Sequence, residues 1–282
     1  MRSLHMPRRT VVLVCIGLFG IAPAVVTASA IAVNNPGDLY TENFDSLPNS
    51  VDWQNKSLVG SGFEWQDEVS VPNWIAYHIG TLSEGGNHRM RITSGGTNVG
   101  SFYSFGDPGA ADRAFGDITS STTNTARWGT RFVNNTGLTL TDFTLSYAGE
   151  QWRDGGASTT GSVAQSIRVG YSLNAGSIVD TAASGLVYTD IPELEFISPN
   201  VGRTTAAALD GNAAENRTAL TATVTGLTWL PGDELWIRWM DSDHSGNDHA
   251  MGIDDLTFSA VPEPATIGLM LVGLTAVVRR RG

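Results

Sequence analysis

The stretch Phe143-Thr144-Leu145-Ser146-Tyr147 places an apolar residue at every second position, with a hydroxyl side chain between. Because successive side chains of a strand point to opposite faces of a sheet, this alternation predicts a strand with one buried and one exposed face. The stretch Ile167-Arg168-Val169-Gly170-Tyr171 repeats the pattern, and Asn134-Asn135-Thr136-Gly137 supplies turn residues between two such runs. These stretches predict a fold built from β-strands joined by turns.

Similar short runs recur along the chain, and no apolar pattern of helical period reaches a useful length. We therefore expect an all-β fold, namely an antiparallel two-sheet sandwich of jelly-roll-like topology. Residues 204–215 are expected to form a surface loop. The expected strands are Trp74–His78, Arg89–Thr93, Val99–Phe105, Ala126–Val133, Leu138–Tyr147, Gln165–Leu173, Ala219–Leu227, Glu234–Asp241 and Ala250–Ser259.

The N-terminal 30 residues have the three parts of a secretory signal peptide. A basic start with Arg2, Arg8 and Arg9 precedes the apolar segment Val11–Ile21, and Ala28-Ser29-Ala30 is a small-residue cleavage site. We expect the export machinery to remove residues 1–30, through either the general or the twin-arginine route. The only cysteine, Cys15, lies in this segment, so the mature chain has no thiol for a disulfide, a metal or a nucleophile.

The C-terminal residues 261–282 form a second three-part segment. Pro262-Glu263-Pro264 is followed by the uncharged stretch Ala265–Val278 and by Arg279, Arg280 and Arg281. A helix of fourteen residues extends about 21 Å, short of the roughly 30 Å hydrocarbon core, but terminal arginines can reach the headgroups. The prolines keep Glu263 extended, as a cleaving enzyme would need. A permanent membrane anchor and a buried core helix are the alternatives.

This order of parts closely resembles the PEP-CTERM sorting tail of exported bacterial proteins. The resemblance implies recognition by an exosortase-type sorting enzyme and delivery to the cell envelope, the cell surface or an extracellular matrix rich in exopolysaccharide. Three further stretches are also similar to other PEP-CTERM proteins. They are Glu-Asn-Phe-Asp at 42–45, the strand end at 147–153 and Gly-Ile-Asp-Asp at 252–255. These matches carry no assigned activity.

The domain between the signal peptide and the C-terminal segment, residues 31–260, has a net charge that limits the classes of partner it can bind. It holds 11 Lys and Arg against 27 Asp and Glu, a net charge of −16. Such a surface repels nucleic acid and anionic lipid and attracts divalent cations. We therefore expect no nucleic-acid partner.

Two groups of acidic residues are candidate calcium ligands. In the stretch from Asp241 to Asp248, Asp241, Asp243 and Asp248 surround a glycine that permits a sharp turn, as in the first half of a calcium-binding loop. The alternative is a solvated polar hairpin that joins Trp236–Met240 to Met251–Phe258.

The second group joins the two ends of the domain, which often lie close together. It comprises Glu42 and Asp45 near the start and Asp254 near the end. The placement loosely resembles jelly-roll carbohydrate-binding modules, in which acids of the first and last strands hold a structural calcium. Asp254 and its neighbour Asp255 should point to opposite faces, so only one can serve directly.

All eight tryptophans lie in the mature domain, and most should be core residues. Trp152 ends a strand beside a glycine-rich loop, so it is the residue expected to be exposed and to stack on a sugar. Packing against Arg153 is the alternative.

Three classes of function remain. The first is a non-catalytic envelope or matrix protein, and the second is a calcium-stabilised carbohydrate-binding module that takes an extracellular polysaccharide. A secreted glycoside hydrolase is third, because the chain has no G-x-S-x-G or H-E-x-x-H motif and no acid pair at the required spacing. We expect no enzyme activity.

Overall fold

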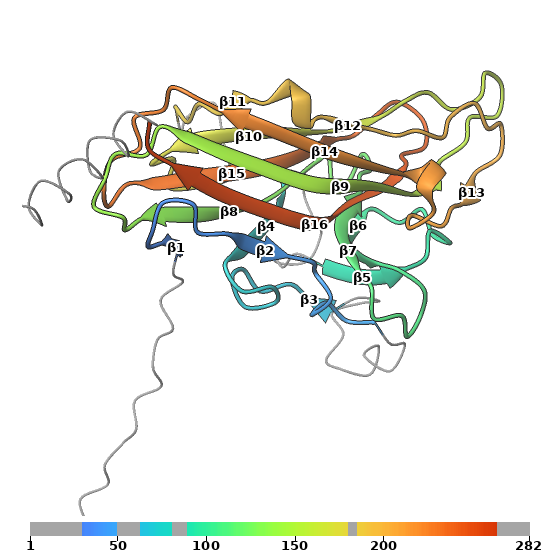
Figure 1. The fold of residues 1–282 in the computed structure, drawn as a ribbon. Helices are drawn as coiled ribbons and strands as arrows, with labels where there is room; N and C mark the ends of the chain where they lie inside the picture. The colour runs from blue at the N-terminus through green and yellow to red at the C-terminus, as the bar shows by residue number, and fades with distance from the viewer. Residues whose placement is uncertain (1–29, 50–62, 81–88, 180–184, 264–282) are drawn as a thin grey trace, which may run out of the picture.

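The computed structural model describes residues 30–49, 63–80, 89–179 and 185–263. These residues form sixteen strands and two short 3-10 helices, η2 (Pro192–Leu194) and η3 (Ala214–Asn216). The strands make two curved sheets that pack face to face (Figure 1). The prediction of an all-β two-sheet sandwich is confirmed.

The first sheet has seven strands. The long strands run antiparallel at its centre, and the short ones extend its two sides. Its path is β1 (Ile31–Val33), β8 (Thr125–Asn134), β15 (Glu234–Ser242), β10 (Ser166–Leu173) and β11 (Thr189–Asp190), with β4 (Trp74–His78) paired to β8 and β12 (Phe196–Ile197) paired to β10.

The second sheet has nine strands. At its centre β9 and β16 pair over most of their length, and a break in register follows Asp254. Its path is β13 (Ala207–Ala208), β9 (Asp142–Asp154), β16 (Ala250–Val261), β7 (Ala114–Ile118), β6 (Ser101–Phe105), β5 (Arg89–Thr93) and β3 (Phe63–Glu64), with β14 (Arg217–Val224) paired to β9 and β2 (Tyr40–Glu42) paired to β16.

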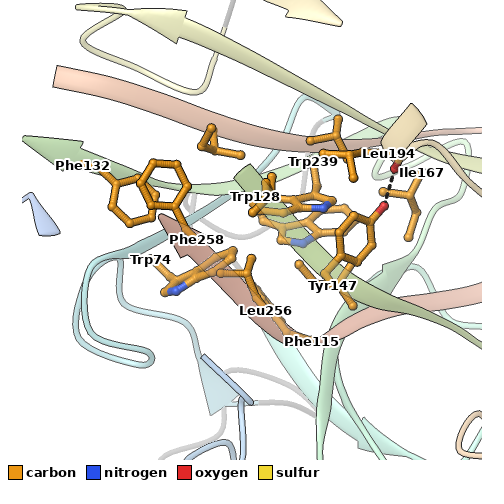
Figure 2. Packing of buried hydrophobic residues seen from close by; sticks show 14 of the residues in the cluster. Trp74, Phe115, Trp128, Phe132, Tyr147, Ile167, Leu194, Trp239, Leu256 and Phe258 are labelled. Carbon is orange, nitrogen blue, oxygen red and sulfur yellow. Dashed lines mark hydrogen bonds between the residues drawn. The ribbon is translucent and has the colours of Figure 1, made fainter. Parts of the chain in front are cut away.

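Alternation along the strands fills the space between the sheets with large aromatic side chains. Trp74 and Trp128 of the first sheet and Phe115 of the second have no exposed surface (Figure 2). The Tyr147 hydroxyl donates a hydrogen bond of 2.5 Å to the backbone oxygen of Leu194, which satisfies the one polar atom of a ring buried in this core. The exposed hydroxyls of β9 stay on its opposite face, as the opening alternation predicts.

Three sequence expectations are wrong in detail. The β1–β8 and β5–β6 pairs are parallel, so the sandwich is not wholly antiparallel. The segment around Asp243 is no hairpin, because β15 belongs to the first sheet and β16 to the second. Residues 42–45 do not lie on the first strand as their sequence suggests, because β1 precedes them and β2 ends at Glu42, and β7 is among the strands that the sequence did not predict.

The last strand ends at Val261, directly before Pro262-Glu263-Pro264. Pro262 is buried and Glu263 is exposed. Pro264, the expected C-terminal helix, Arg279, Arg280, Arg281 and all of the expected signal peptide except Ala30 lie outside the described residues. Within the described ranges, no helix has the length and apolar character needed to cross a membrane.

Candidate functional site

Two hollows in the described part of the sandwich have polar side chains in their walls. The first, which we call the loop-end pocket, has a volume of about 370 Å³ and lies between the segment after β7 and the connection from β15 to β16. Polar side chains dominate its wall, and the connection that crosses between the sheets supplies most of them. The lining residues are Asn98, Thr119, Ser120, Ser121, Asp243, His244, Ser245, Gly246, Asn247 and Asp248.

Two buried carboxyl groups lie beside this pocket. Asp117 on β7 is 0% exposed and Asp241 on β15 is 1% exposed. Burial raises the pKa of both side chains, and their closeness raises the pKa of Asp117 further. Among the described residues, the Asp117 carboxyl has no hydrogen-bond partner other than Asp241, whereas the Ser242 backbone N–H also stabilises the charged form of Asp241. One shared proton would satisfy this pair.

Asp248 connects the buried pair with the pocket wall. Its charge acts on Asp117, Asp241 and Asp243, and its carboxylate accepts a 2.9 Å hydrogen bond from the backbone N–H of His244. The same carboxylate oxygen lies 3.7 Å from the His244 Nδ1, and this contact between the two side chains is the main reason that the pKa of His244 is raised. The structure therefore brings the three loop acids predicted as ligands near one another and adds Asp117.

Glu42 and Asp45, the predicted ligands near the start of the domain, form hydrogen bonds with different groups. Glu42 accepts a 2.8 Å hydrogen bond from the Phe44 N–H, and Asp45 accepts hydrogen bonds from the side chain of Asn43 and the backbone N–H of Arg113. Pairing of β2 with β16 does bring the two ends of the domain together, as expected. Among the described residues, no three acids or histidines are arranged to hold a metal ion. Calcium therefore stays a prediction.

The second hollow, which we call the sheet groove, has a volume of about 580 Å³ and lies on the outer face of the second sheet. Hydroxyl side chains of neighbouring strands form its floor: Ser146 of β9 and Thr221 of β14 make a 2.7 Å hydrogen bond, and Thr257 of β16 lies opposite Ser146. The lining residues are Ser146, Tyr147, Ala148, Ala214, Arg217, Ala219, Leu220, Thr221, Asp255 and Thr257.

Arg217 lies at one end of the groove and is held by three acids. Its Nε is 3.2 Å from Glu150 Oε1, and its Nη2 is 2.5 Å from Asp255 Oδ2 and 3.5 Å from Asp254 Oδ2. Burial raises the pKa of Glu150 to about 8, and the charge of Asp254 adds to this effect. Burial also raises the pKa of Asp254 to about 7, and the charges of nearby acids add to this effect. The expectation that Asp254 and Asp255 point to opposite faces is wrong, because both carboxylates contact Nη2 of Arg217 at a break in the strand register where Asp255 has a φ of 49°. The two side chains differ in exposure, 62% for Asp255 and 2% for Asp254.

The expected exposure of Trp152 is wrong. The residue is 2% exposed, its ring stacks on Phe105, and its Nε1 donates a 3.0 Å hydrogen bond to Glu150. A side chain at Gly211 would collide with the indole, so the segment before η3 lies directly over the ring. Every tryptophan in the described part of the chain is at most 3% exposed, and Trp53 lies outside it.

Sequence reasoning missed Asp117, Glu150 and Arg217. Asp117 and Arg217 are each the only charged residue of their strand, and Glu150 lies in the strand end at 147–153, to which no chemistry could be assigned from sequence. Asp117 acquires its partner only when β7 and β15 face each other across the sandwich. Glu150 and Arg217 meet only because β9 and β14 pair. The one available signal was the presence of charge within these strands.

No protein-family model matches this sequence, and no curated protein does either. The fold is similar to the CBM22-1 xylan-binding domain of Paenibacillus barcinonensis Xyn10C, with a TM-score of 0.32, 9% identity and coverage of 81% of this chain and 97% of that chain. It is also similar to the cyclase Fisc of Fischerella sp. TAU, with a TM-score of 0.34, 12% identity and coverage of 80% and 99%.

A third similar structure is the K3 cleaved adhesin domain of Lys-gingipain from Porphyromonas gingivalis, with a TM-score of 0.33, 15% identity and coverage of 66% and 91%. These three proteins are a binding domain, an enzyme and an adhesin. Likenesses this distant carry no functional argument, since one fold supports many functions. The function must be argued from the two hollows.

Proposed function

We propose that this chain is an exported, non-catalytic β-sandwich of the cell envelope or extracellular matrix that binds polysaccharide in the sheet groove. The observation that carries the proposal is the groove itself, a long open hollow of about 580 Å³ whose floor combines hydroxyl groups with small alanine side chains. Alanine leaves room for a sugar ring, and hydroxyls of Ser146, Thr221 and Thr257 can exchange hydrogen bonds with its hydroxyl groups.

The carboxyl groups near the groove support a binding role over hydrolysis. A glycosidase needs two carboxyls that both reach the scissile bond. Here Glu150 and Asp254 are 1% and 2% exposed and are engaged with Arg217. Of the acids lining the groove, only Asp255 is open to solvent.

A groove-filling substitution tests the proposal. Ala219 is an exposed strand residue of the groove floor, and Ala32 is an exposed strand residue of β1 away from it. We expect Ala219→Trp to weaken retention on the polysaccharide that the wild-type domain binds, and Ala32→Trp to leave it unchanged. A panel of soluble and insoluble polysaccharides measures this in affinity gels and pull-downs. Absence of binding to every polymer, or equal loss in both variants, would overturn the proposal.

Delivery is the second part of the proposal: the signal peptide exports the chain, and the Pro262-Glu263-Pro264 segment presents it to an exosortase-type enzyme. Exposure of Glu263 beyond the last strand supports access by such an enzyme. Replacing all three residues by alanine should leave the tail attached and keep the protein in the membrane fraction. Intact mass and cell fractionation measure the outcome. An unchanged mass and distribution would refute this route.

A further inference from the structure

The ligand class follows from the charge of the sheet groove, on the assumption that the groove binds polysaccharide as proposed above. The basic residue in its wall is Arg217, and three acids already engage this guanidinium. The exposed acid of the groove is Asp255, 62% of whose side chain is accessible although its Oδ2 pairs with Arg217. A ligand entering the groove therefore meets hydroxyls and the accessible part of this carboxylate.

Aromatic stacking does not provide the recognition at this site. No tryptophan lines the groove, and those of the described ranges are all buried. Tyr147, the one aromatic residue in the wall, is 2% exposed and donates its hydroxyl to Leu194. Without an open ring face, affinity must come from hydrogen bonds and charge.

The charge of the whole domain acts in the same direction. At −16, residues 31–260 repel polyanions and attract polycations from beyond the groove. We propose that the sheet groove takes a polysaccharide that carries protonated amines, namely a partly or fully deacetylated amino-sugar polymer. One ammonium group pairs with Asp255, and ring hydroxyls of the same chain bind Ser146, Thr221 and Thr257.

Two polymers that share a backbone and differ only in acetylation test this directly. The purified domain is incubated with chitosan beads and with chitin beads in mildly acidic buffer of low ionic strength, and the bound fraction is measured. We expect strong retention on chitosan, where the amines are charged, and about tenfold weaker retention on chitin. Added salt should release the protein from chitosan.

Asp255→Asn separates the groove from diffuse surface attraction. Asparagine tolerates the positive φ of 49° at this position, so the variant should fold normally. Its matched control is Glu193→Gln, which removes one exposed charge from η2 at a residue that does not line the groove. We expect chitosan binding to weaken about fivefold in Asp255→Asn and to stay unchanged in the control.

Each outcome decides between the proposals. Equal retention on chitin and chitosan overturns the amine inference and leaves polysaccharide binding standing. Equal effects of Asp255→Asn and Glu193→Gln also overturn it, since attraction would then be spread over the surface. Binding to no polymer overturns both proposals. Binding to an anionic polymer only when calcium is present would identify a bridging cation instead and would refute the amine inference.

Discussion

The carboxyl groups of Asp117 and Asp241 face each other between the two sheets, one from β7 and the other from β15. Both are fully buried, and burial with mutual repulsion holds the pKa of Asp117 well above its usual range. The His78 Nε2 lies 3.9 Å from Asp117, too far for a hydrogen bond. One proton shared by the two carboxyls would join the sheets at this end of the sandwich.

The raised pKa values of this pair and of the buried carboxyls of Glu150 and Asp254 predict that the domain loses stability as the pH rises. A carboxyl whose folded pKa is raised binds its proton more tightly in the folded state, so its contribution is complete below the unfolded pKa of about 4. The contribution is lost as the pH rises through the higher folded pKa. Burial raises the pKa of Glu150 to about 8 and that of Asp254 to about 7, which places the decline between about pH 4 and 8. Melting temperature measured against pH in metal-free buffer reports it.

The variant Asp117→Asn measures how much of this pH dependence comes from the Asp117–Asp241 pair. The amide can donate to Asp241 without needing a shared proton, so the variant should melt above the wild type at alkaline pH and lose that advantage at acidic pH. Glu193→Gln, an exposed substitution, should follow the wild-type curve. Parallel curves for wild type and Asp117→Asn would show that the pair does not share a proton.

Calcium binding is predicted from the sequence, and the fold does not decide it. Asp241, Asp243 and Asp248 interact through their charges beside the loop-end pocket, although the described acids are not arranged as a ligand set. If the native state binds the ion, millimolar calcium should raise the melting temperature above that in chelator. Asp243→Asn and Asp254→Asn would then show which predicted group is responsible. An unchanged melting temperature in calcium would end the idea for both groups.

Much of the fold could be predicted because alternation records which face of a strand is buried. β4 and β5 begin and end where the sequence predicts, and β4 directly follows a run of turn residues. β7 was missed because all five of its residues are buried, so its sequence lacks the alternation of a half-exposed strand. The supposed hairpin failed because neighbouring strands usually pair, and here β15 and β16 cross to opposite sheets instead.

The candidate site was harder to predict because its parts come from distant segments. Trp152 is an end-of-strand residue in sequence, and only the segment that carries Gly211, some sixty positions later, covers it. The groove likewise needs the pairing of β14 with β9 before its hydroxyls align. No local pattern encodes such coverage.

The close approach of the sheets at Gly149 predicts a large effect of one methyl group. A Cβ at Gly149 would overlap the ring of Phe196 from the opposite sheet, whereas a Cβ at Gly96 would meet nothing. Gly149→Ala should therefore cost about 1–3 kcal/mol of unfolding free energy, because the core must shift to admit it. Gly96→Ala should be close to neutral. Chemical denaturation measures both, and equal stability of the two variants would contradict the packing described here.

Trp152→Phe tests whether this residue supports the fold or binds ligand. Phenylalanine can keep the stack on Phe105 but removes the indole N–H that donates to Glu150. A buried carboxyl that loses a donor should cost about 1–3 kcal/mol, which corresponds to roughly 2–12 °C in melting temperature for a domain of this size. Polysaccharide binding by the folded variant should stay at the wild-type level, since the ring is covered. Lost binding at an unchanged melting temperature would instead mean that the segment over Trp152 opens and the indole meets the sugar.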